Sequence, residues 1–134
     1  MATVRTEKLP VDTSEDVVRV RQTVRAWAVE LGFGLVDQTK VVTAASELAR
    51  NTVVHGGGGT CELESLQVEN RRGLRLTFVD QGPGIVDIDQ AMRDGFTSGN
   101  GLGLGLGGAR RLSSEFDIRS QPGAGTLVQI VRWK

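Results

Sequence analysis

The 134-residue sequence has no excess of either charge, because 16 Lys and Arg residues balance 16 Asp and Glu residues. A protein that binds nucleic acid by neutralising phosphates needs a basic excess, so this class is disfavoured. The single cysteine, Cys61, cannot form an internal disulfide, and one His with one Cys is a poor start for a zinc site. We expect Cys61 to be a buried apolar residue rather than a nucleophile.

Long apolar runs are also missing. No segment approaches the roughly 20 apolar residues that a membrane-spanning helix needs, and residues 1–10 lack the apolar centre of a signal peptide. The sequence therefore predicts a cytoplasmic protein with no membrane partner. A chain of this length is expected to form a single domain over residues 1–134, with a core that needs no disulfide or metal.

Two long helices are predicted in the first half of the chain. Apolar residues recur at three- and four-residue spacing over residues 17–31, and the second helix is expected at about residues 36–54. A weak strand over residues 3–9 comes first, and Thr13 begins a variant of the capping-box spacing. Glycines at positions 56–59 end the second helix, because a helix does not continue cheaply through them.

Apolar and polar residues alternate in the second half of the chain, as they do in β-strands. It predicts two hairpins, with turns at residues 70–73 and 121–125, and a short helix at about residues 87–94. A glycine-rich loop is expected from residue 95 to 108, merging into a helix that reaches about residue 112. The expected strands cover residues 60–68, 74–79, 115–120 and 126–133. This pattern predicts an α/β protein, specifically an α+β two-layer sandwich with helices on one face of a mixed sheet.

Glu47 and Asn51 form the first candidate site. They are four residues apart on the second helix, so their side chains project from one face. An amide oxygen can bind a hard cation such as Mg²⁺, which keeps several waters and borrows phosphate oxygens. A carboxylate one turn away can accept a proton from an attacking hydroxyl or water. A solvated helical face more often explains an isolated pair of this kind, so the motif alone decides nothing.

The loop that follows the strand at residues 74–79 is the second candidate. Gly82 and Gly84 let the backbone turn tightly and let a flat ligand lie against it. Asp80 could accept a hydrogen bond from an exocyclic amine such as adenine N6. A simple turn after a strand uses the same residue types, so both interpretations of this loop stay open.

Alternating glycines at residues 99–108 form the third candidate. They free backbone N–H groups to point at an anion, and a helix follows. No Gly-Lys-Ser/Thr closes the stretch, so it is not a P-loop, and no strand directly precedes it as in a dinucleotide fingerprint. We expect it to hold phosphates rather than to be a plain flexible loop, since its alternating leucines need packing partners.

In this order the three segments resemble the motifs of the GHKL superfamily. Residues 47–51 are similar to its N box, residues 80–85 to its first glycine box and residues 101–105 to its second. Within the superfamily, the similarity is closest to the anti-sigma-factor serine/threonine kinases of stressosome-type switches. Further segments that carry it are 31–34, 36–38, 94–96 and 111–112. The resemblance implies the Bergerat ATP-binding fold, with helices on one face of a mixed, mostly antiparallel sheet.

The same resemblance implies roles for individual residues. Asn51 would coordinate Mg²⁺, and Glu47 would be the general base toward a serine or threonine of the substrate. Asp80 would hold the adenine amino group of ATP. Gly82 and Gly84 would shape the adenine pocket. Ile85, the last residue of the first glycine box, is also expected to bind the nucleotide, and so are the residues of the second box: Gly101, Leu102, Gly103, Leu104 and Gly105.

Two features depart from the family pattern. Gly103 and Gly105 would line the phosphates under a very short lid over residues 95–101, but the second glycine box is unusually rich in glycine. No lysine lies in the lid or just after it to steady the γ-phosphate. Arg110 or Arg111 could serve, although a basic side chain early in a surface helix is more often simply solvated.

The length of the chain helps to choose among the activities known in the superfamily, because some of them need further domains. A two-component histidine kinase needs a helical domain with a phosphoacceptor histidine, and His55 is the only histidine here. We expect His55 to cap its helix rather than to touch the nucleotide. Topoisomerase and chaperone ATPases need a further domain downstream.

The resemblance implies a kinase that uses Mg-ATP to phosphorylate a serine or threonine of a STAS-domain antagonist protein. It would then be released to activate a PP2C-type phosphatase regulator. One alternative is a nucleotide-gated protein that sequesters a sigma factor. A non-catalytic adaptor is a further alternative, against which the intact Glu47 and Asn51 argue.

Overall fold

The structure, a computed structural model, describes residues 2–93 and 105–134. The elements in chain order are β1 (Ala2–Val11), α1 (Ser14–Glu30), α2 (Leu35–Val54), β2 (Gly59–Val68), β3 (Arg71–Asp80), α3 (Ile88–Ala91), α4 (Gly105–Arg111), β4 (Glu115–Ser120) and β5 (Thr126–Trp133). No helix among these is long and apolar enough to cross a membrane.

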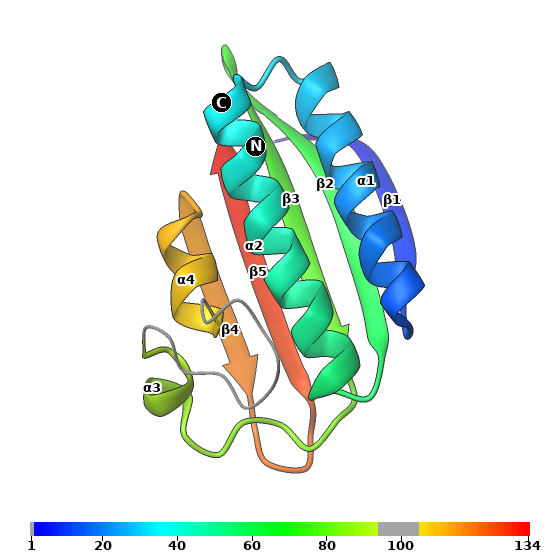
Figure 1. Cartoon of the computed structure of the whole chain (residues 1–134). Helices are drawn as coiled ribbons and strands as arrows, with labels where there is room; N and C mark the ends of the chain where they lie inside the picture. The colour runs from blue at the N-terminus through cyan, green and yellow to red at the C-terminus, as the bar shows by residue number, and fades with distance from the viewer. Residues whose placement is uncertain (1, 94–104) are drawn as a thin grey trace.

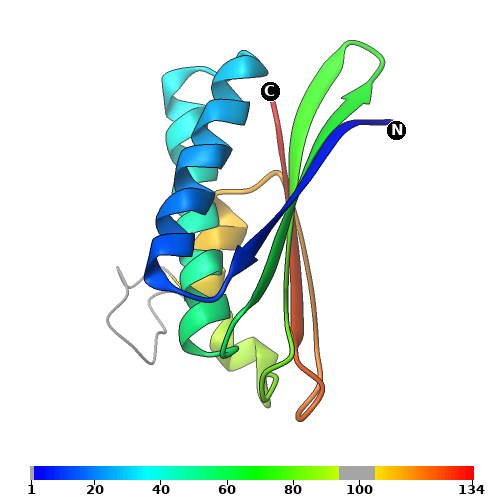
Figure 2. The same cartoon turned by 90° about the vertical axis from the view of Figure 1, so that its right-hand side faces the viewer.

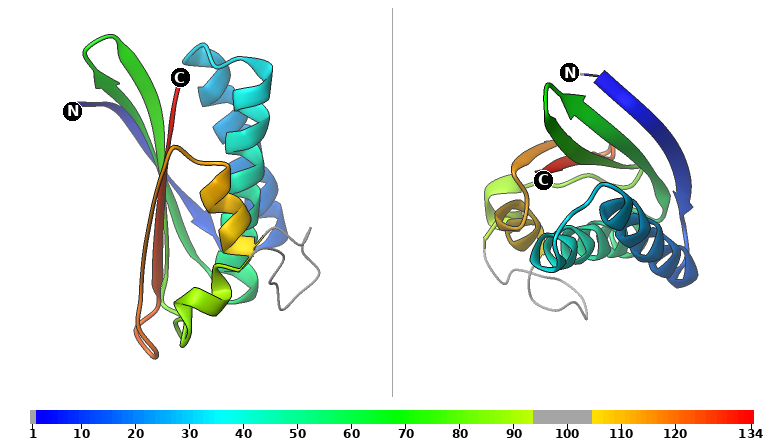
Figure 3. Two further views of the ribbon diagram at one scale, coloured as in Figure 1. Left: turned by 90° about the vertical axis from the view of Figure 1, so that its left-hand side faces the viewer. Right: turned by 90° about the horizontal axis from the view of Figure 1, so that it is seen from above.

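The molecule has two layers (Figure 1). One is a five-stranded sheet in the order β1-β2-β3-β5-β4, and the other consists of helices that cover one face of it. Figures 2 and 3 show the sheet edge-on and from above, with α1, α2 and α4 on the same side. The expected two-layer α/β architecture is therefore confirmed. Within the described residues every neighbouring pair of strands is antiparallel, so the sheet is not mixed.

The core lies between the two layers. The inward faces of α1 and α2 pack against alternate residues of the central strands, as the helical and strand periodicities predict. Cys61 lies in this core with no exposed surface, and burial raises the pKa of its thiol. It is therefore a small apolar core residue, as expected. The largest buried core side chains include Val20, Val24, Val41, Leu48, Leu63, Leu76 and Ile130.

The first hairpin turns earlier than the sequence predicted. A turn was expected at residues 70–73, but β3 begins at Arg71 and only two residues connect the strands. Glu69 has a φ of 53°, in the left-handed region that tight hairpin turns use. Gly73 lies inside β3 instead, where the ring of Trp133 covers it. A Cβ atom at Gly73 would meet that ring at 2.6 Å.

The glycine-rich segment also differs from the prediction. The loop was expected to extend to residue 108, but α4 begins at Gly105. Its residues 105–109 are all buried, and α4 packs against α2. Burial against α2 therefore outweighs the low helix propensity of glycine. The short helix α3 is also smaller than predicted, and Asp87 caps it.

A capping box begins α1 at the expected place. Thr13 Oγ1 accepts a hydrogen bond from the Asp16 N–H at 3.1 Å, and Asp16 Oδ2 accepts from the Thr13 N–H at 3.2 Å. The same oxygen accepts from the Asp12 N–H at 2.9 Å. These bonds, with the Asp12 N–H contributing most, hold the pKa of Asp16 below its ordinary value. The Asp16 carboxylate therefore joins the end of β1 to the start of α1.

Asp16→Asn is expected to lower the midpoint of thermal unfolding at neutral pH, because a neutral amide is a weaker acceptor at a helix N-terminus. The folded-state pKa is depressed, so the stabilisation is present above the ordinary carboxyl pKa and is lost as the pH falls through the folded value. Thermal melts of variant and parent should therefore differ at neutral pH and converge in acid. Glu15→Gln, an exposed carboxylate in the same turn, is the control and should change little at either pH.

Candidate functional site

A pocket of about 300 Å³ lies between the C-terminal half of α2, the loop after β3 and the start of α4. Its wall combines apolar side chains with a small number of polar groups, the usual composition of a small-molecule site. The apolar lining residues are Leu48, Phe78, Pro83, Ile85, Ala91, Leu106 and Val128. The polar lining residues are Asn51, Thr52, His55, Asp80 and Thr126.

Asp80 occupies the position at the end of β3 that the sequence predicted. Its Oδ1 atom accepts a hydrogen bond from the Gly82 N–H at 2.9 Å, which shapes the turn. Within the described residues, Oδ2 accepts no hydrogen bond and is therefore available to a ligand in the pocket. Thr126 is the register partner of Asp80 on β5, so a hydroxyl and a carboxylate lie side by side at this end of the sheet.

Glycines let the end of α2 and the loop after β3 come into contact. A Cβ atom on Gly82 would lie 2.7 Å from both the Cα and the carbonyl oxygen of Gly56. A Cβ atom on Gly56 would meet the Asp80 side chain. Gly84 has a φ of 77°, and a Cβ there would meet the carbonyl oxygen of Gln121. The pocket wall at residues 80–85 therefore requires glycine for close approach as well as for turning.

The turn between β4 and β5 supports the same loop from its other side. Ser120 Oγ accepts a hydrogen bond from the Ile85 N–H at 2.8 Å. The hydroxyl also donates to the Gly125 carbonyl oxygen at 3.0 Å and lies 2.8 Å from Thr126 Oγ1. Sequence reasoning missed Ser120 and Thr126, because only the strand pairing brings them to the loop.

Asn51 and Glu47 project from α2 as expected, but they are placed differently. Asn51 is half-buried and lines the pocket. Glu47 lies one turn earlier, is only 5% exposed and is not among the lining residues. No hydrogen bond or ion pair joins its carboxylate to another residue in the described part of the chain. Nothing in the described part of the chain therefore competes for the Glu47 carboxylate, which lies one helical turn from Asn51.

The other predicted site residues are only partly described. Gly101, Leu102, Gly103, Leu104 and the lid at residues 95–101 lie outside the described residues. Gly105 begins α4, with a φ of 58°, and lines the pocket. Arg110 and Arg111 were expected early in this helix, but they lie in its last turn, and neither lines the pocket. Their contact with phosphate stays a prediction.

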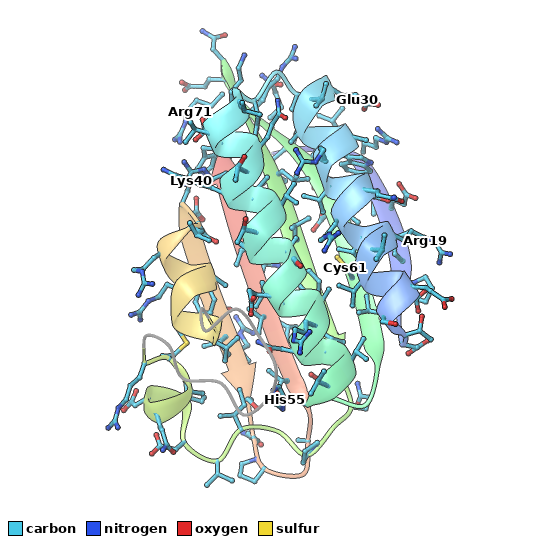
Figure 4. The ribbon with its side chains drawn as sticks, viewed as in Figure 1. Arg19, Glu30, Lys40, His55, Cys61 and Arg71 are labelled. Atoms are coloured by element: carbon cyan, nitrogen blue, oxygen red, sulfur yellow. The ribbon has the colours of Figure 1, made fainter. Side chains whose placement is uncertain are left out.

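His55 was considered as a helix cap and as a residue that touches the nucleotide, and its position suits both. It is the C-cap residue of α2, and its N–H donates to the Asn51 carbonyl oxygen at 2.9 Å. It also lines the pocket, at the end of α2 where Figure 4 labels it.

Comparison with known proteins agrees with this geometry. Residues 11–132 match the histidine kinase-like ATPase domain. The chain belongs to this family. It is 46% identical to the serine/threonine-protein kinase RsbT of Bacillus subtilis over 121 residues, which cover 90% of this chain and 91% of that protein. The expected enzyme class, a protein serine/threonine kinase, is confirmed by this similarity.

More distant relatives support the same family. The chain is 30% identical over 126 residues to the anti-sigma F factor of Pasteuria penetrans, covering 89% of this chain and 83% of that protein. Among solved structures, the RsbU and RsbW domains of a Mycobacterium tuberculosis protein align with a TM-score of 0.66 at 22% identity, covering 98% of this chain and 33% of that one. The mycobacterial sensor histidine kinase MprB aligns with a TM-score of 0.55 at 24% identity, covering 92% of this chain and 95% of that one. These two structures establish the fold.

Proposed function

We propose that this kinase uses Mg-ATP to phosphorylate a serine or threonine of a STAS-domain antagonist protein in the cytoplasm. After phosphotransfer, it would leave that protein and activate a PP2C-type phosphatase regulator. The observation that carries the proposal is the pocket, which brings Asn51 and Asp80 together with the glycine-shaped loop. It does so in a chain that is 46% identical to a serine/threonine-protein kinase.

The adenine end of the nucleotide fits beside Asp80. Oδ2 of this side chain can accept a hydrogen bond from the exocyclic amine of adenine, while Oδ1 keeps the turn closed through Gly82. The hydroxyl of Thr126 adds a second polar group at the same end of the pocket. Phe78, Ile85 and other apolar side chains line the rest of it and suit a flat aromatic base.

The phosphate end fits beside Asn51. Mg²⁺ needs few protein ligands because it keeps waters and binds phosphate oxygens, so one amide oxygen from Asn51 suffices. When bound, this ion neutralises charge that builds up on the transferred phosphoryl group. Glu47, one turn away on the same helix face, would accept the proton of the attacking hydroxyl. Gly105, with the preceding glycines, would lie against the phosphates.

Phosphotransfer itself is the test. The purified chain is incubated with Mg²⁺, γ-labelled ATP and each STAS-domain protein of the same organism, and the labelled residue is identified by mass spectrometry. Label on a serine or threonine of one of these proteins is expected. Tight nucleotide binding with no label on any of them would refute the substrate assignment.

Sequestration of a sigma factor is the second candidate function. The 30% identity to an anti-sigma F factor favours it. Stoichiometric co-elution of a sigma factor with the nucleotide-bound chain would support this function, and separate elution would count against it.

Gly56→Ala is expected to weaken ATP binding by about tenfold, the value of one hydrogen bond to a charged group. The new methyl group would occupy the place of the Asp80 side chain and turn its carboxylate away from adenine. Calorimetric titration with ATP measures the effect. Gly34→Ala is the control, because no atom lies within 4 Å of a Cβ there, and its affinity should match the parent. An unchanged affinity of Gly56→Ala would contradict the assignment of Asp80 to adenine.

A further inference from the structure

Most of the exposed large apolar side chains belong to the helix layer. Seven large hydrophobic residues are exposed in the described part of the chain, and five of them belong to α1 and α2. Val18 and Val29 are 42% and 56% exposed, and with Gln22 and Arg25 they follow one stripe along α1. The other three, on α2, are Leu35, Val36 and Val54. An exposed stripe of this kind along α1 is a candidate interaction surface.

The same two helices carry basic residues that have no ionic partner, of which Arg21 and Arg25 are exposed and Lys40 and Arg50 are half-buried. Arg21 and Arg25 on α1, with Lys40 and Arg50 on α2, form no ion pair within residues 2–93 and 105–134. Figure 4 labels Lys40 on α2, in the layer that faces the viewer. These four cations are therefore available to a partner.

Most acidic residues of α1 and α2 are held in ion pairs and so do not offset these cations. Asp16 pairs with Arg19, Glu30 pairs with Arg5, and Asp37 pairs with Arg132. Glu47 is buried, so Glu15 is the one exposed carboxylate of α1 and α2 that lacks an ion pair. The chain as a whole has no net charge, but the outer face of α1 and α2 presents a basic and apolar surface. A partner that complements it must be acidic and must carry apolar side chains of its own.

This basic-apolar face adjoins the kinase site. α1 and α2 pack side by side, and the view from above in Figure 3 shows both helices on the same side of the sheet. Arg50 directly precedes Asn51, and Ser46 directly precedes Glu47. A protein that lies along the outer face of α2 therefore comes next to the helix that carries the proposed base and Mg²⁺ ligand.

We propose that the outer face of α1 and α2 is the docking surface for the protein substrate, which binds it through an acidic, partly apolar surface around its acceptor hydroxyl. The inference rests on the proposed function, because it assigns this face to the substrate of that reaction. Arg21 and Arg25 supply electrostatic attraction, and Val18 and Val29 supply apolar contact. Charged groups at the rim of an interface act mainly on the association rate and on its salt dependence.

The test is the double variant R21E/R25E, assayed for phosphotransfer to the STAS-domain protein that the parent labels. The expected result is a KM for that protein raised by about tenfold or more, with kcat little changed. The KM of the parent should rise with ionic strength, and that of the variant should rise less or not at all. The affinity for ATP should stay at the parental value, since neither arginine lines the nucleotide pocket.

The matched control is K8E/R119E, which makes the same change of charge at two exposed residues of the sheet. Its KM, kcat and affinity for ATP should equal those of the parent. A parental KM for R21E/R25E would overturn the docking proposal while leaving the proposed function intact.

Other outcomes identify a different occupant. If R21E/R25E transfers phosphate normally but no longer activates the PP2C-type phosphatase, the face belongs to that partner and the proposal is wrong. If sedimentation shows that the parent self-associates and R21E/R25E does not, the face joins two copies of this chain, which also overturns it. If the parent labels no STAS-domain protein at all, the proposed function itself fails, and the docking proposal falls with it.

Discussion

Glu47→Ala is expected to keep the nucleotide affinity of the parent and to slow phosphotransfer by about 10²–10⁴-fold, the usual contribution of a general base. The two effects separate because Glu47 lies one turn away from Asn51 and does not line the pocket. Its carboxylate has no hydrogen-bond or ion-pair partner within the described residues, so it is free to accept a proton from the substrate. Single-turnover transfer from labelled ATP measures the rate, and calorimetric titration measures the affinity.

Glu47→Gln provides a second, independent readout. The amide has nearly the same shape, so it should be as inactive as alanine if the lost function is proton transfer. The midpoint of thermal unfolding should stay near the parental value in both variants, whereas a merely structural role for Glu47 would lower it. Transfer at the parental rate by Glu47→Ala would rule out Glu47 as the base.

The first half of the fold could be predicted well from local signals. Thr13 and Asp16 have the spacing of a capping box, and the structure forms both of its hydrogen bonds. The apolar stripes of α1 and α2 face the sheet, and α2 ends at Val54, with His55 as its C-cap, before the glycine run. These features depend on neighbours within one or two helical turns. A single sequence carries that information directly.

The second half shows where local reasoning stops. Glycine at positions 105, 107 and 108 predicts a loop, but these residues form a helix because α4 packs against α2. Propensity is a weak prior that tertiary burial can override. For the same reason, Arg110 and Arg111 were expected near the start of a helix and lie at its end.

The candidate site was predictable only for residues that lie within recognisable motifs. Asn51 and Asp80 both line the pocket, as their motifs implied. Ser120 and Thr126 were missed, since they reach the loop after β3 only through the antiparallel register of β3 with β5. Such pairing joins segments far apart in the sequence. No spacing rule along the chain reveals it.

Asn51→Ala is expected to remove the part of nucleotide affinity that depends on Mg²⁺. Asn51 is half-buried, lines the pocket and is the proposed protein ligand of the ion, so its loss leaves only phosphate oxygens and water. Titrations with ATP in the presence of Mg²⁺ and of a chelator should differ strongly for the parent and little for the variant. Affinity in Mg²⁺ should fall by about tenfold or more, as is usual when a residue of a metal site is removed.

Asn51→Asp is the matched variant, because a carboxylate restores an oxygen ligand of similar size at the same place on α2. It should recover the dependence on Mg²⁺, whereas alanine should not. A variant with alanine that binds Mg-ATP as tightly as the parent would show that Asn51 is not the ligand. If ATP affinity depends on Mg²⁺ with asparagine or aspartate at position 51 and not with alanine, the side-chain oxygen at this position binds the ion. The proposed base, Glu47, then lies one helical turn from the Mg²⁺ ligand.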